Sequence, residues 1–167
     1  MEKLEKLSKK WNVRNLTEDD STAILTLYQS NPLYFQHCPP PPSLESVRED
    51  MLRLPDGKTE SDKYYLGFWE GDSLVAVMDF VYGYPDEQTV FIGLFMVHQD
   101  YQGKGVGSVI VKEALRFFSQ DHQKARLACV KSNPQAEHFW RKQGFLPIGV
   151  EAQEPTYAVE IMEKDLG

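Results

Sequence analysis

The sequence has few cysteines, no excess of positive charge and no long apolar run. Its 167 residues include only Cys38 and Cys129, too few for a disulfide framework or a cysteine metal cluster. Lys and Arg number 18 against 25 Asp and Glu, and a net charge of −7 argues against a nucleic-acid partner. No apolar run reaches the roughly 18 residues of a membrane span, and the charged first residues do not resemble a signal peptide. We therefore expect a cytoplasmic protein without metal, nucleic-acid or membrane ligands.

The pattern of apolar residues predicts a mixed α/β protein. With 167 residues, 41% hydrophobic and 26% charged, one domain over residues 1–167 is the default. Period-two alternation and turn residues predict strands over 11–16, 64–69, 73–82, 89–97, 125–130, 145–150 and 156–162. Helical spacing and capping residues predict helices over 17–30, 43–54, 109–118 and 134–143. Short turns between strands 64–97 indicate antiparallel neighbours, and the proline-rich stretch 31–42 is expected to be a loop.

A glycine-rich turn separates the apolar run 90–97 from the amphipathic run 109–118. Gly103, Gly105 and Gly107 lie within five residues, so no Cβ blocks the approach of a ligand to the backbone. The following helix presents free N–H groups and a partial positive charge at its first turn. This combination predicts a site for phosphate or diphosphate.

Three known phosphate-binding patterns compete for this turn. A P-loop requires G-x-x-x-x-G-K-[ST], which does not occur. A dinucleotide fingerprint requires G-x-G-x-x-G, but the string from Gly103 ends in Ser108, and the next strand has no acidic residue at its tip. The remaining pattern, Q/R-x-x-G-x-G/A, is matched by Gln102, Gly105 and Gly107.

That pattern resembles the acyl-CoA-binding motif of the GCN5-related N-acetyltransferase (GNAT) superfamily. The likeness runs from Val97 through Gly107, and a second block from Asn133 to Phe145 resembles the family's second motif. The resemblance implies a GNAT-like three-layer sandwich, with a twisted, largely antiparallel mixed sheet of six to seven strands flanked by about four helices. It also implies acetyl-CoA as the co-substrate.

The resemblance assigns cofactor contacts along these two motifs. The diphosphate would lie on the backbone of the turn, and the pantetheine arm would pair like an extra strand with the main chain of Met96 and Val97. Asn133 could reach the arm, although Asn before Pro134 is also a favoured helix cap. Phe139 and Trp140 would wall the channel or belong to the core, and we favour the core for both. The turn residues concerned are Gln102, Gly103, Lys104, Gly105, Val106, Gly107 and Ser108.

The catalytic groups are not evident in the sequence. Many family members carry Tyr at the position of Trp140 and Glu or His in the strand before the turn, but residues 91–95 contain neither Glu nor His. Asp79 and Tyr157 are the candidates, with Tyr101 or water as further proton donors. Asp79 lies in an apolar run, and alternation places it more readily on a solvated face.

Three functions remain open at this point. The first is direct acetyl transfer in a ternary complex to a small-molecule or peptide amine, by a monomer or homodimer, with an acceptor pocket near Tyr34, Phe35 and His37. The second is an inactive acyl-CoA-binding regulatory module, because the usual Tyr and strand acid are missing. The third, a nucleotide-dependent oxidoreductase, is more distant.

Overall fold

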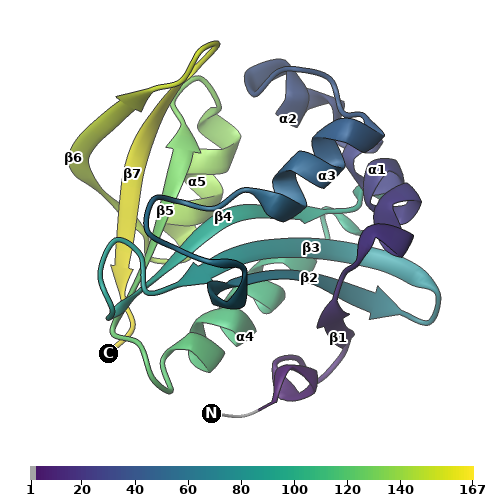
Figure 1. Ribbon diagram of the computed structural model, residues 1–167, viewed down its shortest axis with the longest axis horizontal. Helices are drawn as coiled ribbons and strands as arrows, with labels where there is room; N and C mark the ends of the chain where they lie inside the picture. The colour runs from purple at the N-terminus through teal and green to yellow at the C-terminus, as the bar shows by residue number, and fades with distance from the viewer. Residues whose placement is uncertain (1–2) are drawn as a thin grey trace.

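The computed structural model describes residues 3–167 and is built around one seven-stranded sheet (Figure 1). The strand order is β1-β2-β3-β4-β5-β7-β6, and every neighbouring pair is antiparallel except β4 and β5. The strands are β1 (Asn12–Asn15), β2 (Lys63–Glu70), β3 (Ser73–Tyr82), β4 (Thr89–Val97), β5 (Lys124–Val130), β6 (Leu146–Gln153) and β7 (Ala158–Asp165).

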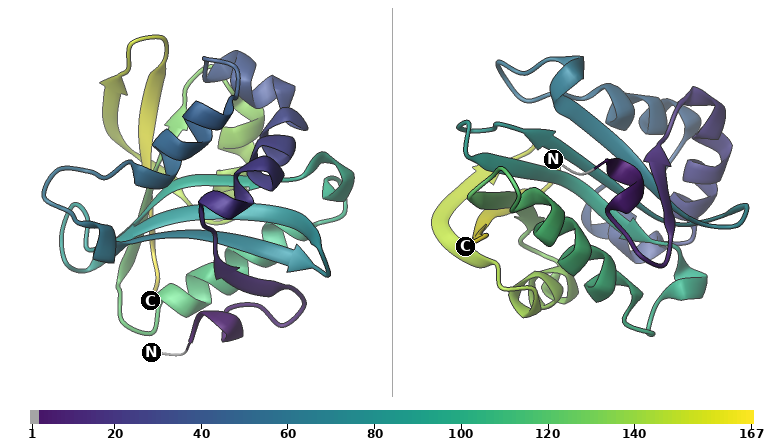
Figure 2. Two further views of the ribbon diagram at one scale, coloured as in Figure 1. Left: turned by 45° about the vertical axis from the view of Figure 1, so that its right-hand side comes forward. Right: turned by 90° about the horizontal axis from the view of Figure 1, so that it is seen from below.

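Helices cover both faces of this sheet, so the molecule has three layers (Figure 2). On one face lie α1 (Ser21–Gln29), α2 (Pro32–His37) and α3 (Leu44–Leu52). On the other face lie α4 (Val106–Phe118) and α5 (Pro134–Lys142). The core is correspondingly divided, because α4 packs Ile110, Phe117 and Phe118 on one face while α1 packs Ile24 and Leu27 on the other. The predicted sandwich is confirmed, with five α-helices rather than about four.

The one parallel pair, β4 with β5, is only partly joined. Pairing runs from Thr89 opposite Lys124 to Ile92 opposite Leu127 and then stops, although β4 continues to Val97 and β5 to Val130. The register between β3 and β4 also shifts at this level, and it leaves Gly93 as the extra residue of a bulge. A bulge increases local twist, which turns the end of β4 away from β5. We call the resulting opening the strand gap.

One segment predicted as a loop is a helix. Residues 31–42 were expected to be irregular because of their prolines, but α2 begins at Pro32 and ends at His37. Pro at the first helical position is compatible with a helix, because its missing N–H needs no partner there. Tyr34 and Phe35 anchor α2 on the core that α1 also covers, whereas the run from Pro39 to Pro42 stays non-helical as expected.

Within residues 3–167, no helix combines the length and apolar character needed to cross a membrane.

Candidate active site

The glycine turn has the open backbone that the sequence predicted. Gly103 and Gly105 adopt φ values of 78° and 77°, a left-handed conformation that other residues rarely adopt. A Cβ added at either position would find no atom within 4 Å, so the turn borders open space. Gly105 is also the N-cap of α4, and the first helical N–H to find an acceptor is that of Val109, bonded to Gly105 O at 3.1 Å. The preceding N–H groups are therefore available to a ligand.

A cavity of about 630 Å³ extends along this turn, and we call it the turn groove. Five predicted residues line it at the turn, namely Gln102, Gly103, Gly105, Val106 and Gly107, and Ser108 continues the lining into α4. Lys104 is exposed and does not line the groove, so it could act on a phosphate only as a charge at the rim. The groove is large enough for the phosphate end and arm of a nucleotide-derived cofactor.

Gln102 fixes the entrance to the turn rather than pointing freely at a ligand. Its Nε2 donates to Val97 O at 2.8 Å and to Asn31 Oδ1 at 2.6 Å. Asn31 Nδ2 in turn donates to the same Val97 oxygen at 3.1 Å. These bonds hold the segment after α1, the end of β4 and the turn together, so the groove is preorganised.

The edge of β4 offers unpaired peptide groups to the strand gap. His98 N donates to Val75 O on β3 at 2.8 Å, so by alternation the peptide groups of Met96 also face β3 while those of Val97 and Phe95 face the gap. Val97 N–H is thus free to meet an extended arm. Met96 lines the groove, but its main-chain groups face β3, whereas those of Phe95 lie beside Val97 on the side of the gap.

The start of α5 forms the opposite wall. Asn133 caps the helix by accepting from Ala136 N at 3.2 Å through its carboxamide oxygen, which leaves its NH₂ group for a ligand. Phe139 and Trp140 line the turn groove while also packing on the core, with Phe139 stacked on Phe95 at 6.0 Å. The two aromatic residues therefore have both of the roles that the sequence left open.

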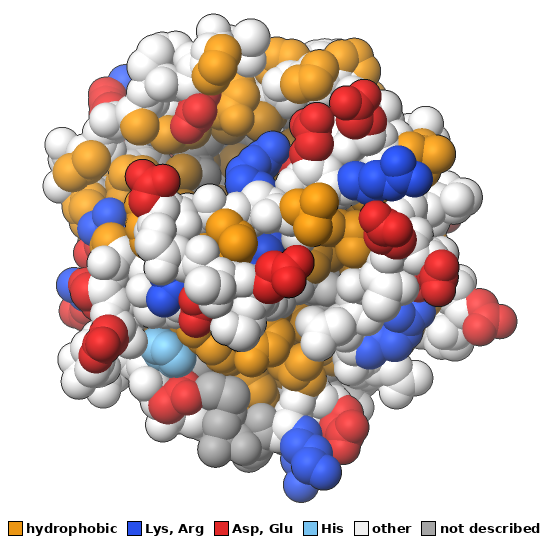
Figure 3. Space-filling model, viewed as in Figure 1, with side chains coloured by type: hydrophobic (Ala, Val, Ile, Leu, Met, Phe, Trp, Pro, Cys, Tyr) orange, Lys and Arg blue, Asp and Glu red, His pale blue; other side chains and the backbone are white. Residues whose placement is uncertain are grey.

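A second cavity, of about 470 Å³, lies on the other face of the sheet beside α3. We call it the α3 cavity, and Figure 3 shows the hollowed face with acidic side chains near α3. A passage of about 60 Å³ at the strand gap shares Gly93, Leu94, Ala128 and Val130 with the α3 cavity. It shares Phe95, Asn133, Ala136 and Trp140 with the turn groove. The passage thus lies between the two cavities, at the place where the pairing of β4 with β5 stops.

Of the three residues predicted to bind the acceptor, two line the α3 cavity and one does not. Tyr34 and Phe35 line the α3 cavity, as does Tyr157. His37 does not line it. Its Nδ1 pairs with Ser132 Oγ at 2.9 Å, and this bond joins α2 to the segment after β5. Tyr101 lines the turn groove only.

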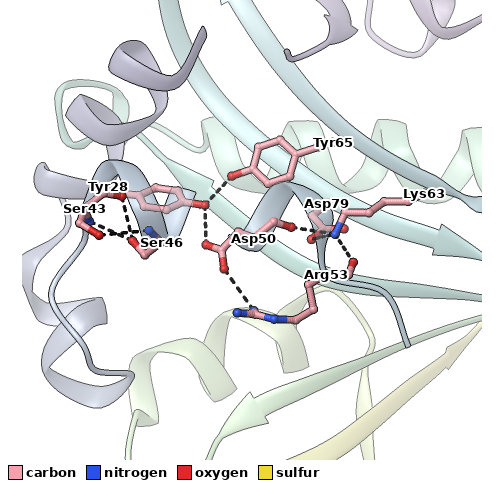
Figure 4. Close-up of polar contacts among 8 residues, drawn as sticks. All are labelled: Tyr28, Ser43, Ser46, Asp50, Arg53, Lys63, Tyr65 and Asp79. Carbon is pink, nitrogen blue, oxygen red and sulfur yellow. Dashed lines mark hydrogen bonds and ion pairs between the residues drawn. The ribbon is translucent and has the colours of Figure 1, made fainter. Parts of the chain in front are cut away.

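A polar network forms the floor of the α3 cavity (Figure 4). Tyr28 donates its hydroxyl hydrogen to Asp50 Oδ2 at 2.8 Å and also pairs with the Tyr65 hydroxyl. Asp50 forms an ion pair with Arg53 at 3.1 Å. Lys63 Nζ donates to the carbonyl oxygens of Asp50 and Arg53 at 2.8 and 2.5 Å, so it caps the end of α3. Sequence reasoning missed this role, because Lys63 ends a polar stretch and its partners lie far away in the sequence, on α3 and β3.

Asp79 is buried, which corrects its expected placement on a solvated face. Only 7% of the residue is exposed, and its Oδ2 accepts from Lys63 Nζ at 3.1 Å. A Cβ at Gly93 would lie 3.3 Å from the same oxygen, so the carboxylate packs against the bulge of β4 beside the strand gap. Burial raises the pKa of Asp79 to about 6, against the opposing effect of Lys63. Alternation failed here because helices cover both faces of β3.

This arrangement can bring two ligands together across a sheet. One side supplies glycine-turn and helix N–H groups suited to a diphosphate, and the free edge of β4 suits an amide-bearing arm. The other side supplies a separate cavity with a buried carboxylate at its inner end. No cluster of His, Cys, Asp and Glu that could hold a metal occurs in residues 3–167. Such a site suits a transferase whose donor carries a diphosphate and an amide-bearing arm.

Comparison with known proteins gives the family. Residues 22–145 match the family described as Acetyltransferase (GNAT) family, and the chain belongs to it. This family uses acetyl-CoA as acetyl donor, and both predicted motifs lie within the match or at its end. No curated protein matches the chain.

Solved structures show the same fold at low sequence identity. An acetyltransferase from Thermus thermophilus has a TM-score of 0.74 at 20% identity, over 93% of this chain and 97% of that one. An acetyl transferase from Salmonella typhimurium, described as modifying the N-terminal serine of ribosomal protein L7/L12, has a TM-score of 0.73 at 16% identity, over 96% and 98%. The paia N-acetyltransferase of Thermoplasma acidophilum, solved with coenzyme A, has a TM-score of 0.67 at 16% identity, over 93% and 98%.

Proposed function

We propose that this N-acetyltransferase transfers the acetyl group directly, in a ternary complex, to a primary amine held in the α3 cavity. The observation that carries this proposal is the strand gap, where the small passage shares lining residues with both the turn groove and the α3 cavity. A donor lying in the groove and an acceptor lying in the cavity would meet there without a covalent enzyme intermediate.

The residues of the turn groove fit the donor. The N–H groups from Gly103 to Ser108 would hold the diphosphate at the start of α4, where the helix dipole favours negative charge. Val97 N–H, Phe95 and the Asn133 amide would hold the arm in the strand gap. Phe139 and Trp140 would exclude water from the arm.

Asp79 would hold and deprotonate the amine. An ordinary alkyl ammonium has a pKa of about 10.4, so presenting it neutral at pH 7 costs roughly 4 to 5 kcal/mol. A carboxylate beside the strand gap first attracts the ammonium and then accepts its proton as the C–N bond forms. Lys63 keeps that carboxylate ionised at neutral pH despite its burial.

The acceptor that we propose is a small-molecule amine or a peptide amine. The α3 cavity has aromatic walls, including Tyr34, Phe35 and Tyr157, which suits a small-molecule amine or the end of a peptide. The relative from Salmonella typhimurium, described as acting on a protein N-terminus, is consistent with a peptide. We further propose that residues 1–167 act as one domain, as a monomer or homodimer in the cytoplasm, on an acceptor other than nucleic acid or membrane, in line with the net charge of −7.

The test combines cofactor binding with thiol release. Wild-type protein should bind CoA and release free thiol from acetyl-CoA in the presence of at least one member of a panel of amines and peptides. Gly105→Glu should weaken CoA binding by roughly 100-fold or more, because it places a carboxylate against the diphosphate and forces a side chain into a left-handed position. Gly71→Glu is the matched control, since Gly71 has φ of 59° in the hairpin between β2 and β3 and does not line the groove.

Three outcomes would count against this function. Unchanged CoA affinity in Gly105→Glu, with Gly71→Glu equally unaffected, would place the cofactor elsewhere. Tight CoA binding by the wild type without turnover on any amine would instead support the acyl-CoA-binding module. Protection against melting by NADP but not by CoA would support the oxidoreductase.

A further inference from the structure

Tyr34 occupies a position that no other described residue shares. It lines the turn groove, the passage at the strand gap and the α3 cavity, whereas each of its neighbours lines at most two of these. Its ring is held in an edge contact with Phe35 at 4.9 Å. Tyr34 therefore borders both cavities and the passage that lies between them.

The reaction needs a hydrogen-bond donor at this place. As the acetyl carbon forms its bond to the amine nitrogen, the bond to sulfur breaks and negative charge develops on the sulfur. Trp140 lines the passage, but it packs its indole ring against Phe139 and Phe145. Its N–H group is no practical acid.

The other hydroxyl groups around these three cavities each line only one of them. Tyr101 lines the turn groove but neither the passage nor the α3 cavity, and Tyr157 and Cys38 line only the α3 cavity. Tyr34 lines the α3 cavity together with Cys38 and Tyr157, so it also borders the acceptor side of the gap. That is the end of the passage where an acetylated thiol would meet an amine.

We propose that Tyr34 donates its phenolic hydrogen in a hydrogen bond to the departing sulfur, and that α2 thereby supplies the group that α5 lacks. This inference rests on the proposed function. The amine proton goes to Asp79, the acetyl group goes from sulfur to nitrogen, and the thiolate later takes a proton from solvent. Burial, reinforced by Cys38 and Asp50, raises the pKa of Tyr34 well above its usual value. The residue therefore keeps its proton and serves as a donor rather than transferring the proton outright.

The experiment compares Tyr34→Phe with wild type in two measurements. The first is steady-state kinetics, in which we expect kcat to fall about 10- to 100-fold, the range for one hydrogen bond to a charged group, with the KM for the amine little changed. The second is the pKa of the thiol of bound CoA, followed by thiolate ultraviolet absorbance with desulfo-CoA as the blank. We expect that pKa to be higher in Tyr34→Phe, because the bound thiolate loses its donor.

Two further variants make the result specific. Tyr64→Phe removes a hydroxyl from a ring stacked on Phe80 that lines none of the three cavities, and it should leave both measurements unchanged. The inference is overturned if Tyr34→Phe raises only the KM for the amine, or if Tyr157→Phe shifts the bound thiol pKa and Tyr34→Phe does not. The thiol titration needs no turnover, so failure of the proposed function, seen as absent CoA binding or absent wild-type activity, is distinguished from failure of this assignment.

Discussion

At the residue scale, Asp79 shows how burial converts an ordinary carboxylate into a group that titrates near neutral pH. Its surroundings on β3 are apolar, so desolvation disfavours the charged form, and the cation of Lys63 only partly offsets this. A carboxylate with a pKa of about 6 is ionised at pH 7 yet basic enough to accept a proton. The residue therefore suits proton transfer better than a solvated aspartate would.

Asp79 should set a limb in the pH profile of kcat/KM. Activity should rise with pH through about 6, because protonated Asp79 can neither attract nor deprotonate the ammonium. Asp79→Asn should remove this limb and lower kcat/KM roughly 100-fold at pH 7.5. The dependence of kcat/KM on the deprotonation of the free amine, seen at higher pH, should remain.

Acid unfolding caused by protonation of Asp79 cannot explain the loss of activity at low pH. Because the pKa of Asp79 is raised on folding, the folded state binds more protons between about pH 4 and 6, and its contribution to the free energy of unfolding falls as pH rises. Stability and activity thus change in opposite directions over this range. Asp72→Asn, in the exposed hairpin between β2 and β3, should leave the pH profile unchanged; a profile in Asp79→Asn identical to wild type would remove Asp79 from the mechanism.

At the element scale, the side chain of Lys63 joins the end of α3 to the sheet. Lys63 begins β2, and only 7% of its side chain is exposed to solvent. Its ammonium group joins two carbonyl groups at the end of α3 to Asp79 on β3. Lys63 thus holds one wall of the α3 cavity in place, and it favours the ionised form of Asp79 on the floor of that cavity.

Lys63→Met should therefore be strongly destabilising. Removing one member of a buried ion pair costs about 3 to 5 kcal/mol, and urea unfolding at pH 7 should show a loss of that order. The loss should be smaller at pH 5, where Asp79 is protonated and needs no cation. Lys131→Met breaks an exposed pair with Glu151 and should change stability little. Equal losses in the two variants, or a loss independent of pH, would contradict this account of the network.

The elements themselves were largely readable from the sequence, and their long-range pairing was not. Alternation placed β2, β3 and β4 within a residue or so, and the pattern Asn133-Pro134 located the start of α5 correctly. The helix α2 was missed because its stability comes from packing Tyr34 and Phe35 on the core rather than from local propensity. Lys63 and the bulge at Gly93 were also invisible, since both depend on which strand or helix lies opposite.

At the scale of the whole molecule, the proposed function depends on the place where the pairing of β4 with β5 stops. Residues far apart in the sequence, on β4, β5 and α2 and at the start of α5, surround a passage that no single motif encodes. The motifs predicted the glycine turn as a phosphate site, because its chemistry is local. The α3 cavity and its position next to the turn groove depend on how distant segments pack in the folded chain. The central claim is that the donor crosses the sheet at this passage.

A crystal structure of the protein with bound CoA tests that claim most directly. We expect the diphosphate on the N–H groups of the turn from Gly103 to Ser108, the arm alongside Val97 in the strand gap, and the sulfur at the mouth of the α3 cavity beside Tyr34. Density for the diphosphate at another place, or an arm that runs over the surface while the gap between β4 and β5 stays empty, would contradict the account.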